Sequence, residues 1–344
     1  MTDKILQTGS AQAGHDDVAA INQLRDIYKK IRAEIAKVII GQDEVIERLM
    51  ICILARGHGL LMGVPGLAKT TIVNSLAQVM SLQFSRVQFT PDLMPSDITG
   101  TEILQETDQP GRRAFQFVKG PVFANIVLAD EINRTPPKTQ SALLEAMQEH
   151  RVTVAGKSVA LPSPFFVLAT QNPIEQEGTY NLPEAQLDRF MFFIVVDYPS
   201  AAEEGRISRE TTGAPAQPLS KLISGEQVIH FQDVVQRVPV PDHIHDAAVE
   251  LVRASRPKSE DAPDWIKSWV TWGAGPRAVQ YLIRGAKARA VLQGSYLVRM
   301  EDLEAVAQPV LMHRILTNFQ AQSEGVTSGF IIEKLLGELR EKEK

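Results

Sequence analysis

The first pattern along the chain is a stripe of apolar side chains at spacings of three and four residues, which predicts a helix from Ile21 to Val38. A second helical pattern begins at Asp43 and continues to Arg56. From Gly59 on, short apolar runs alternate with helical periodicity, and this alternation predicts a parallel sheet covered by helices. The expected strands and helices of this part are Gly59–Met62, Thr70–Met80, Phe84–Phe89, Ile126–Asp130, Pro136–His150, Phe165–Gln171, Glu184–Phe190 and Met191–Val196.

The character of the chain changes after Tyr198-Pro199, where helical patterns replace the alternation. We therefore expect an α/β domain over residues 18–199 and a small all-α domain over residues 200–344. A joint rich in Pro, Gly and Ala, Gly213–Pro218, lies early in the second domain. Residues 1–17 are polar and rich in Gly, Ala and Gln, so this N-terminal segment is expected to be flexible.

Two predicted hairpins interrupt the α/β pattern. In the first, strand-like Thr101–Leu104 and Ala114–Val118 flank the polar turn Thr107–Gly111. The second, shorter hairpin pairs Arg151–Val154 with Ser158–Leu161. Hairpins of this kind are usually surface decoration, but function is often added to a catalytic core through such insertions, so contact with a substrate is the alternative interpretation.

Composition and charge narrow the possible classes. A chain of 344 residues is longer than one hydrophobic core usually covers, so we expect two domains. Its 44% of apolar side chains is ordinary for a globular protein. The net charge of −5 gives no basic excess that would indicate nucleic acid as a partner. Cys52 is the only cysteine, which excludes a disulfide framework and a cysteine metal cluster. Neither a signal sequence nor an apolar run of roughly 18–20 residues is present, so we expect a cytoplasmic protein without membrane insertion.

The strongest chemical signal is a glycine-containing loop between the apolar run Leu60–Met62 and a predicted helix. In that geometry the backbone N–H groups of the loop and the helix N-terminus point at one spot, which suits a phosphate. Lys69 can reach the outer phosphates and the Thr70 hydroxyl can ligate Mg²⁺. Ala68 replaces the last glycine of the usual pattern, which costs little if the backbone there is helical. The loop residues are Gly63, Val64, Pro65, Gly66, Leu67, Ala68, Lys69 and Thr70, followed by Thr71.

A second signal is the apolar run Ile126–Ala129, which ends in the carboxylates Asp130 and Glu131. Ligands bind at the carboxyl ends of the strands in open α/β sheets, so both side chains are expected there. Asp130 would hold the Mg²⁺ shell, and Glu131 would activate the water that attacks the γ-phosphate. The structural alternative is a strand followed by an acidic helix cap, which the preceding phosphate loop makes the weaker interpretation.

Three further polar residues occur where a nucleotide enzyme needs them. Asn172 follows the apolar strand ending at Gln171 and either orients the attacking water or forms an Asn-Pro turn. Arg189, at a helix end, is either a surface ion pair or a finger that reaches the γ-phosphate of a neighbouring subunit. Arg277 lies in the first turn of a helix, an unfavourable place for a cation, which indicates an anionic partner nearby.

Together these segments resemble the MoxR family of AAA+ ATPases, in the branch that carries a helix-2 insert and a pre-sensor-1 hairpin. The resemblance covers nearly everything between Ile21 and Leu339. It implies a P-loop NTPase core with a parallel sheet, the two hairpins as the named inserts, and a helical lid. The most specific segments are 40–42, 63–70, 130–134, 143–149, 169–173 and 182–190.

The resemblance also implies roles for single residues. Asn172 would be sensor 1, Arg189 the arginine finger acting on a neighbouring subunit, and Arg277 sensor 2 on the lid. Gly41 and Gln42 would line the adenine pocket, and Ala68 is normal at its position in the family. The implied ligands are ATP and Mg²⁺.

The assembly and partners are likewise implied by the resemblance alone. The family commonly forms hexameric rings with ATP between subunits, and its members remodel or activate client proteins, frequently with von Willebrand A-domain proteins. Two alternatives stay open from the sequence, a nucleic-acid motor of the same branch and a relative of magnesium-chelatase ATPase subunits. A non-enzymatic switch is disfavoured because Glu131, Asn172 and Arg189 are all present, while Arg134 is ambiguous between pairing with Glu131 and contacting the next subunit.

Overall fold

The computed structural model describes residues 3–106, 113–174, 178–211 and 218–342. The predicted turn at 107–111 and most of the joint at 213–218 fall outside these residues. The helices are α1 (Asp3–Ile35), α2 (Asp43–Leu54), α3 (Lys69–Val79), α4 (Pro95–Thr99), η1 (Ile132–Arg134), α5 (Pro137–Glu149), α6 (Glu184–Leu187), α7 (Ala201–Thr211), α8 (Gly225–Arg237), α9 (Asp242–Ala254), α10 (Asp264–Trp269), α11 (Pro276–Leu292), α12 (Met300–Leu311), α13 (Phe319–Ser323) and α14 (Ser328–Lys342). The strands are β1 (Gly59–Met62), β2 (Phe84–Gln88), β3 (Gly100–Glu106), β4 (Arg113–Lys119), β5 (Ile126–Asp130), β6 (Arg151–Val154), β7 (Lys157–Ala160), β8 (Phe166–Gln171), β9 (Phe192–Val195), β10 (Val270–Trp272) and β11 (Leu316–Thr317).

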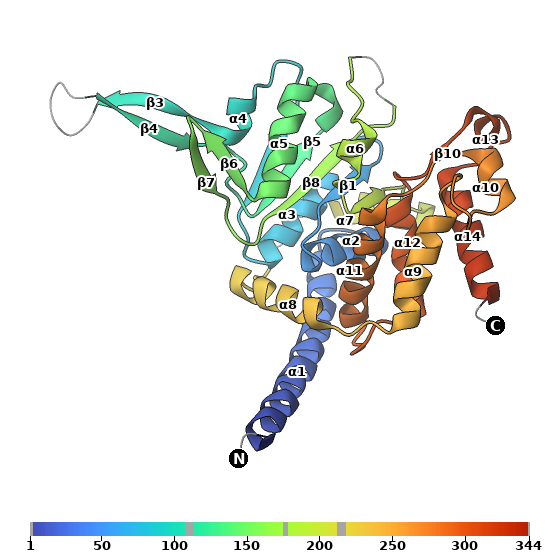
Figure 1. The fold of residues 1–344 in the computed structure, drawn as a ribbon. Helices are drawn as coiled ribbons and strands as arrows, with labels where there is room; N and C mark the ends of the chain where they lie inside the picture. The colour runs from blue at the N-terminus through green and yellow to red at the C-terminus, as the bar shows by residue number, and fades with distance from the viewer. Residues whose placement is uncertain (1–2, 107–112, 175–177, 212–217, 343–344) are drawn as a thin grey trace.

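A parallel sheet in the order β2-β5-β8-β1-β9 lies at the centre of the N-terminal part (Figure 1). Its strands match the predicted apolar runs to within a residue at each end, which confirms the α/β expectation. Helix α6 is the main difference, because it ends at Leu187, whereas the pattern predicted a helix to Phe190. The chain must turn there to enter β9 at Phe192.

Alternate side chains of the strands enter two different apolar layers, as the pleat requires. In β5, Ile126 and Leu128 pack into the layer that includes α2 and α3, whereas Val127 and Ala129 pack into the layer that includes α5. Both layers are buried, which explains why the strands read as continuous apolar runs. The sheet is therefore fixed from both faces, and its strand ends are held in place.

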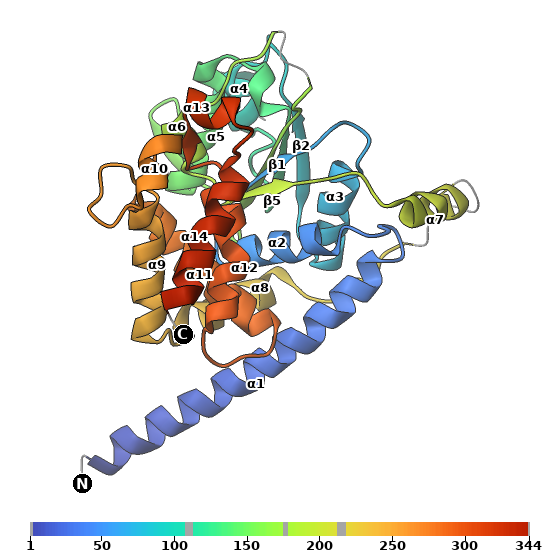
Figure 2. The ribbon, with the colours of Figure 1, turned by 90° about the vertical axis from the view of Figure 1, so that its right-hand side faces the viewer.

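Helices α9, α11, α12 and α14 lie together on one side of the sheet (Figures 1 and 2). Buried side chains of α8, α9, α11, α12 and α14 belong to the same cluster as those of α1, α2 and β9. The prediction of an all-α domain needs one correction, because β10 and β11 form a two-stranded antiparallel sheet. β-branched and aromatic residues, such as Val270 and Trp272, explain the short strand.

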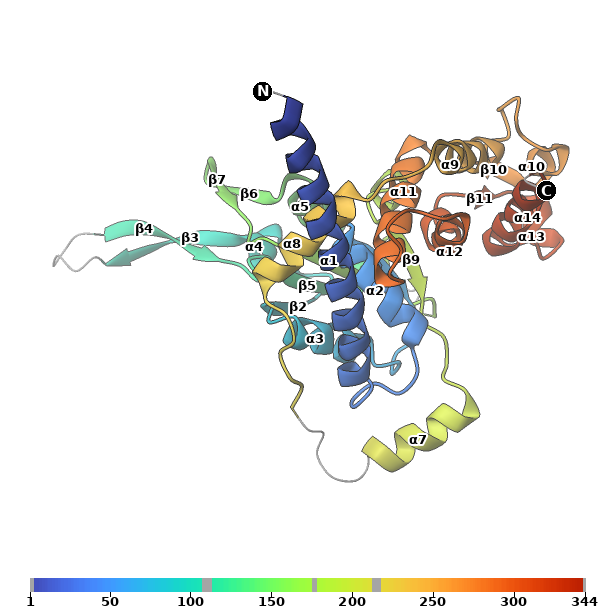
Figure 3. The same cartoon turned by 90° about the horizontal axis from the view of Figure 1, so that it is seen from below.

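The two predicted hairpins are present and lie on the same side of the molecule (Figures 1 and 3). The pair β3–β4 projects away from the body, and the shorter β6–β7 lies beside it. Lys157 Nζ lies 3.3 Å from Glu102 Oε1, which links the second hairpin to the first. Ala155 and Gly156 form the turn of the second hairpin with positive φ values of 48° and 79°.

Helix α1 is one long element that crosses under the body (Figure 2). The segment 1–17, expected to be flexible, is helical from Asp3, and its Ala and Gln residues favour a helix. Helix α7 buries none of its residues and projects from the body (Figure 3). Within the described residues, no helix is long and apolar enough to cross a membrane.

Candidate functional site

A cavity of about 500 Å³ lies at the carboxyl ends of β1, β5 and β8, where the loop after β1 enters α3. Cavities of about 300–1,000 Å³ are the usual size of small-molecule sites. The position agrees with the rule that open α/β sheets bind ligands at this edge. Its lining contains most of the residues that the sequence singled out, namely Pro65, Gly66, Leu67, Ala68, Lys69, Thr70, Thr71, Asp130, Glu131 and Asn172, together with Arg86 and Thr170.

Lys69 is the first residue of α3, and its side chain folds back over the loop. Its Nζ donates hydrogen bonds to the carbonyl oxygens of Gly63 and Val64, the second at 3.2 Å. Burial lowers the pKa of the Lys69 ammonium, while the carboxylates of Asp130 and Glu131 act in the opposite direction. A partly buried cation beside a helix N-terminus is a suitable partner for an anionic ligand.

Thr170, which the sequence did not single out, fixes both acidic residues at the end of β5. Its hydroxyl donates to Asp130 Oδ1 at 2.6 Å and accepts a hydrogen bond from the backbone N–H of Glu131 at 2.9 Å. Thr170 is only 1% exposed, so this arrangement is rigid. It comes from β8, the neighbour of β5 in the sheet, and the sequence pattern does not reveal the register between the two strands.

Residues of the other neighbour, β2, contact the same two carboxylates and were also missed. Arg86 Nε and Nη2 donate to Asp130 Oδ2 at 3.0 and 2.6 Å, and Gln88 Nε2 donates to Glu131 Oε2 at 2.7 Å. The register of the sheet explains this, because Gln88 pairs with Asp130 across β2 and β5. The only sequence signal is the spacing of Arg86 and Gln88, which places them on one face of a strand. Arg134 Nη1 adds a contact to Glu131 Oε2 at 3.2 Å, in agreement with one of its two expected roles.

Asn172 lines the cavity from the end of β8 and is 8% exposed. Its Oδ1 accepts a hydrogen bond from the backbone N–H of Ile174 at 3.2 Å, which forms the turn that was one of its two interpretations. The side-chain amide nitrogen is a donor that a ligand oxygen or water can use. The turn and the proposed contact with water are therefore compatible.

Several residues of the predicted site have left-handed backbone conformations. Gln42, Ala68 and Glu131 have φ values of 59°, 54° and 56°. The condition under which alanine at position 68 would cost little, helical backbone angles, is therefore not met, because Ala68 precedes the helix as a left-handed N-cap. A Cβ in this conformation costs about 1 kcal/mol. Such strain is found at functional sites, where the surrounding structure holds it.

Gly41 and Gln42 do not line the cavity; they lie between α1 and α2. Gln42 Nε2 donates to the carbonyl oxygen of Asp197 at 3.1 Å. Gly41 has φ 71°, and a Cβ there would lie 2.3 Å from Glu203 Oε1 at the start of α7. This corner therefore joins the segment before α2 to the segment after β9.

Arg189 lies outside the cavity, in a separate recess of about 270 Å³ beside α5. Its Nη1 donates to the carbonyl oxygen of Leu144 at 3.3 Å and also to Gln148 Oε1. Its own phosphate loop is therefore not its partner in this structure.

Arg277 is the second predicted cation that lies apart from the cavity. Its Nη1 donates to Asp188 Oδ2 at 2.8 Å, and Arg314 Nε donates to the other oxygen of Asp188 at 2.7 Å. The anionic partner expected for Arg277 is thus a carboxylate of the chain itself. Arg277 and Asp188 are 38% and 29% exposed, so the pair is accessible to water and can exchange partners.

The donor set of the cavity fits a nucleotide with Mg²⁺. A threonine hydroxyl, a carboxylate and a cation at a helix N-terminus are the groups that such a ligand uses. The described residues contain no group of three or more His, Cys, Asp or Glu side chains that could hold a metal ion. A divalent ion here would therefore rely on phosphate oxygens and water for its other ligands.

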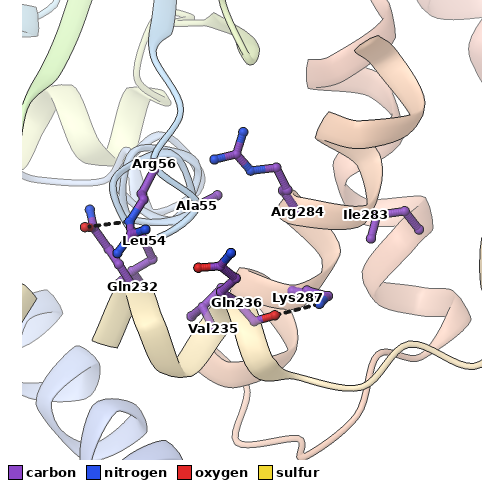
Figure 4. A pocket seen from close by; sticks show the side chains of 9 residues that line it. All are labelled: Leu54, Ala55, Arg56, Gln232, Val235, Gln236, Ile283, Arg284 and Lys287. Carbon is purple, nitrogen blue, oxygen red and sulfur yellow. Dashed lines mark hydrogen bonds between the residues drawn. The ribbon is translucent and has the colours of Figure 1, made fainter. Parts of the chain in front are cut away.

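A second cavity, of about 250 Å³, lies between α2, α8 and α11 (Figure 4). Arg56, Arg284 and Lys287 line it, but none of the predicted site residues does. Arg56 also pairs with Asp233 at the surface. The predicted residues thus select the cavity at the phosphate loop rather than this one.

Comparison with known families gives two matches. Residues 58–192 match the ATPase family associated with various cellular activities (AAA). Residues 265–335 match the AAA lid domain. The first range contains the phosphate loop, both carboxylates and Arg189, and the second contains Arg277.

Individual relatives extend the likeness to most of the chain. The chaperone MoxR1 of Mycobacterium tuberculosis is 43% identical over 88% of this chain and 79% of its own length. An uncharacterised protein of Bacillus subtilis, YeaC, is 40% identical over 92% of this chain and 95% of its own length. A crystal structure from Cytophaga hutchinsonii, described as a candidate ATPase, superposes with a TM-score of 0.86 at 42% identity, over 96% of this chain and 98% of that one.

Proposed function

Because the chain belongs to the MoxR family of AAA ATPases, we propose that it binds ATP with Mg²⁺ in the phosphate-loop cavity and hydrolyses it to ADP and phosphate. The observation that carries this proposal is the convergence of Lys69, Thr70, Asp130, Glu131 and Asn172 on one cavity. These residues come from three strand ends and supply each type of group that phosphoryl transfer requires.

Each of these residues has a role that its position supports. Lys69 contacts the outer phosphates, and Thr70 and Asp130 hold the Mg²⁺ shell, which neutralises charge on the phosphates. Glu131 accepts the proton of the attacking water, and Asn172 orients that water. Thr170 keeps the two acidic residues in register through its hydrogen bonds to both.

The test separates binding from chemistry. Lys69→Ala is expected to lose nucleotide binding, because the phosphates lose the cation at the helix N-terminus. Glu131→Gln is expected to bind ATP but to lose about 10²–10⁴ in turnover, because the general base is absent. Binding is measured with a fluorescent ATP analogue and turnover by phosphate release.

Glu226→Gln, an exposed change in the first turn of α8, is the matched control and should behave as the unmodified protein. Full turnover by Glu131→Gln would refute its assignment as the base.

We further propose that the protein acts as a ring of identical subunits, a hexamer by analogy with its family, in the cytoplasm. Arg189 would then reach the ATP of a neighbouring subunit, and Arg277 would contact ATP from the lid. In support of a role outside its own subunit, Arg189 lies in a recess apart from the cavity. Gly41 and Gln42 would face the adenine, at the corner that they form with Asp197.

The biological role that we propose is remodelling or activation of partner proteins, as the name of the relative MoxR1 suggests. The two linked hairpins supply a surface for such a client. Von Willebrand A-domain proteins are the class of client that we propose. Replacing Ala155-Gly156-Lys157 by a shorter turn should leave basal ATP hydrolysis unchanged and abolish any effect of the chain on a client that co-purifies with it. Loss of basal hydrolysis, or an unchanged effect on the client, would contradict this role of the hairpin.

The same proposal predicts that DNA does not stimulate ATP turnover, whereas a nucleic-acid motor would be stimulated.

A further inference from the structure

The Asp130 carboxylate accepts three hydrogen bonds from the chain, one at Oδ1 and two at Oδ2. Thr170 donates to Oδ1, and Arg86 donates twice to Oδ2, at 3.0 and 2.6 Å. A carboxylate oxygen accepts about two hydrogen bonds, so Oδ2 has no capacity left for a metal-bound water. The Asp130 side chain is 13% exposed, whereas that of Arg86 is 49% exposed, so Arg86 is the partner that can leave.

We infer that Arg86 competes with the divalent cation for the Asp130 carboxylate. When the cation arrives together with a nucleotide, Arg86 leaves Asp130 and binds the phosphates instead. This inference rests on the proposed function, because it assumes that Asp130 serves the Mg²⁺ shell. Arg86 itself lines the same cavity as Lys69 and Thr70, the residues that we propose contact the phosphates and the cation. Its planar donors match phosphate oxygens as well as they match a carboxylate.

The exchange has a direction that charge dictates. A divalent cation alone must displace Arg86 from Asp130 and leaves the guanidinium without an anion. A nucleotide with its cation supplies that anion at the same time, so the loss of one pair is compensated by the other. Arg86 therefore makes the site discriminate against free metal and in favour of metal bound to a nucleotide.

A purely structural role of Arg86 predicts the opposite sign. If Arg86 only held Asp130 in position for the metal, removing it would weaken metal binding. Competition instead predicts that removing it strengthens the binding of metal alone.

The experiment measures Mn²⁺ binding without nucleotide by electron paramagnetic resonance, and binding of ATP without metal in the presence of EDTA. Arg86→Gln is expected to bind Mn²⁺ about three- to tenfold more tightly than the unmodified protein, the range expected for loss of a partly exposed charged pair. The same variant is expected to bind metal-free ATP several-fold more weakly. Arg86→Lys keeps the charge but loses the two-donor fork, so both of its affinities should lie between those of Arg86→Gln and those of the unmodified protein.

Arg56→Gln is the matched control, because Arg56 forms an exposed ion pair with Asp233. It lies at the other cavity, beside Gln232 (Figure 4). The variant should change neither affinity. Equal or weaker Mn²⁺ binding by Arg86→Gln would overturn the inference. The proposed function would still stand in that case if ATP binding depends on Lys69. Absence of any ATP binding that depends on Lys69 would overturn both.

Discussion

The phosphate-loop cavity and the junction around Arg189 contain the two halves of the predicted site, and they differ in how complete they are. We define the Arg189 junction as residues 188–191 with the side chains of Arg277, Tyr281, His313 and Arg314 that contact them. In the cavity, the predicted side chains line one common space, although Lys69, Asp130 and Glu131 are also hydrogen-bonded to other groups of the chain. In the junction, the predicted cations Arg189 and Arg277 are bound to groups of the chain itself.

The difference follows from how each region is built. The cavity is formed by the ends of adjacent parallel strands, which meet at one edge of the sheet whatever the rest of the chain does. The junction is formed where the second domain contacts the turn between α6 and β9. Its geometry therefore depends on the packing of two domains, which can change when a ligand binds.

The second domain holds the backbone on both sides of Arg189. Arg314, 5% exposed, donates from Nη2 to the carbonyl oxygens of Asp188 and Phe190, both at 2.8 Å. The Tyr281 hydroxyl donates to the carbonyl oxygen of Arg189 at 3.1 Å. Tyr281 and Arg277 lie on the same helix, α11, so a movement of α11 changes the surroundings of both cations together.

The largest effect that sharpens this comparison is expected from Arg189→Ala. If Arg189 completes the cavity of a neighbour, the variant should bind ATP normally but lose about 10³–10⁵ in turnover, because the charge on the transferred phosphoryl group loses its partner. Mixing it with Lys69→Ala should restore part of the activity, since some interfaces then combine an intact loop with an intact finger. Turnover is measured at a series of mixing ratios, with mixed assembly verified by differently tagged subunits.

Either of two results would break the comparison. Full activity of Arg189→Ala alone would mean that the cavity is complete within one subunit. Mixed assemblies that form but stay inactive would mean that Arg189 acts within its own chain. Glu226→Gln again serves as the control for the effect of tags and mixing.

A smaller effect in the cavity is expected from Thr170→Val, which keeps the shape of the side chain but removes its hydroxyl. The variant loses the hydrogen bonds to Asp130 Oδ1 and to the N–H of Glu131. Because buried polar groups are left without partners, we expect a loss of about 1–3 kcal/mol in the free energy of unfolding. Turnover should fall more than ATP affinity does, since both acidic residues lose their alignment, and Thr170→Ser should restore it. Chemical denaturation and steady-state kinetics measure the two effects. Unchanged turnover would show that the contacts from Arg86, Gln88 and Arg134 hold the acidic residues without Thr170.

The comparison also explains which parts of the site the sequence could predict. Lys69, Asp130 and Asn172 follow apolar runs whose strand character is evident, and parallel strands place their ends together. The contacts of Arg86 require knowing that β2 is the other neighbour of β5, and those of Thr170 require the register of β8 beside β5. That order depends on packing between residues far apart in the chain, which local periodicity does not encode.

Some details of the site that the sequence misjudged or left open also depend on contacts between distant parts of the chain. The left-handed backbone of Ala68 depends on the closure of the whole loop, not on the preference of alanine. The partner of Arg277 depends on where α11 packs against the turn at Asp188. The sequence could therefore predict only that this partner is negatively charged. The assembly and the client remain proposals, because no pattern within one chain specifies them.

The smallest effect concerns the pH dependence of the Arg189 junction. His313 is 8% exposed, with Nε2 at 3.1 Å from the carbonyl oxygen of Phe190 and 2.7 Å from Arg314 Nη1. Burial, and after it the charge of Arg314, lower the pKa of His313 well below its ordinary value. A protonated imidazole would add a buried charge beside Arg314, so the junction requires the neutral form.

The sign of the effect on stability follows from this. Because the pKa is lower in the folded protein, the unfolded chain takes up the proton first as the pH falls below about 6.5, the ordinary value for histidine. Stability is therefore complete above that pH and declines as the pH falls, by about 1 kcal/mol for this group between pH 7.5 and 5.5. His58, whose pKa burial lowers to about 4, contributes in the same direction, so His313 must be isolated by substitution. Urea denaturation should show a smaller decline for His313→Gln than for the unmodified protein over this range, while His243→Gln, an exposed change on α9, should leave the decline unaltered. Equal declines for His313→Gln and the unmodified protein would mean that the junction tolerates a charged imidazole, and that its contacts are looser than those of the cavity.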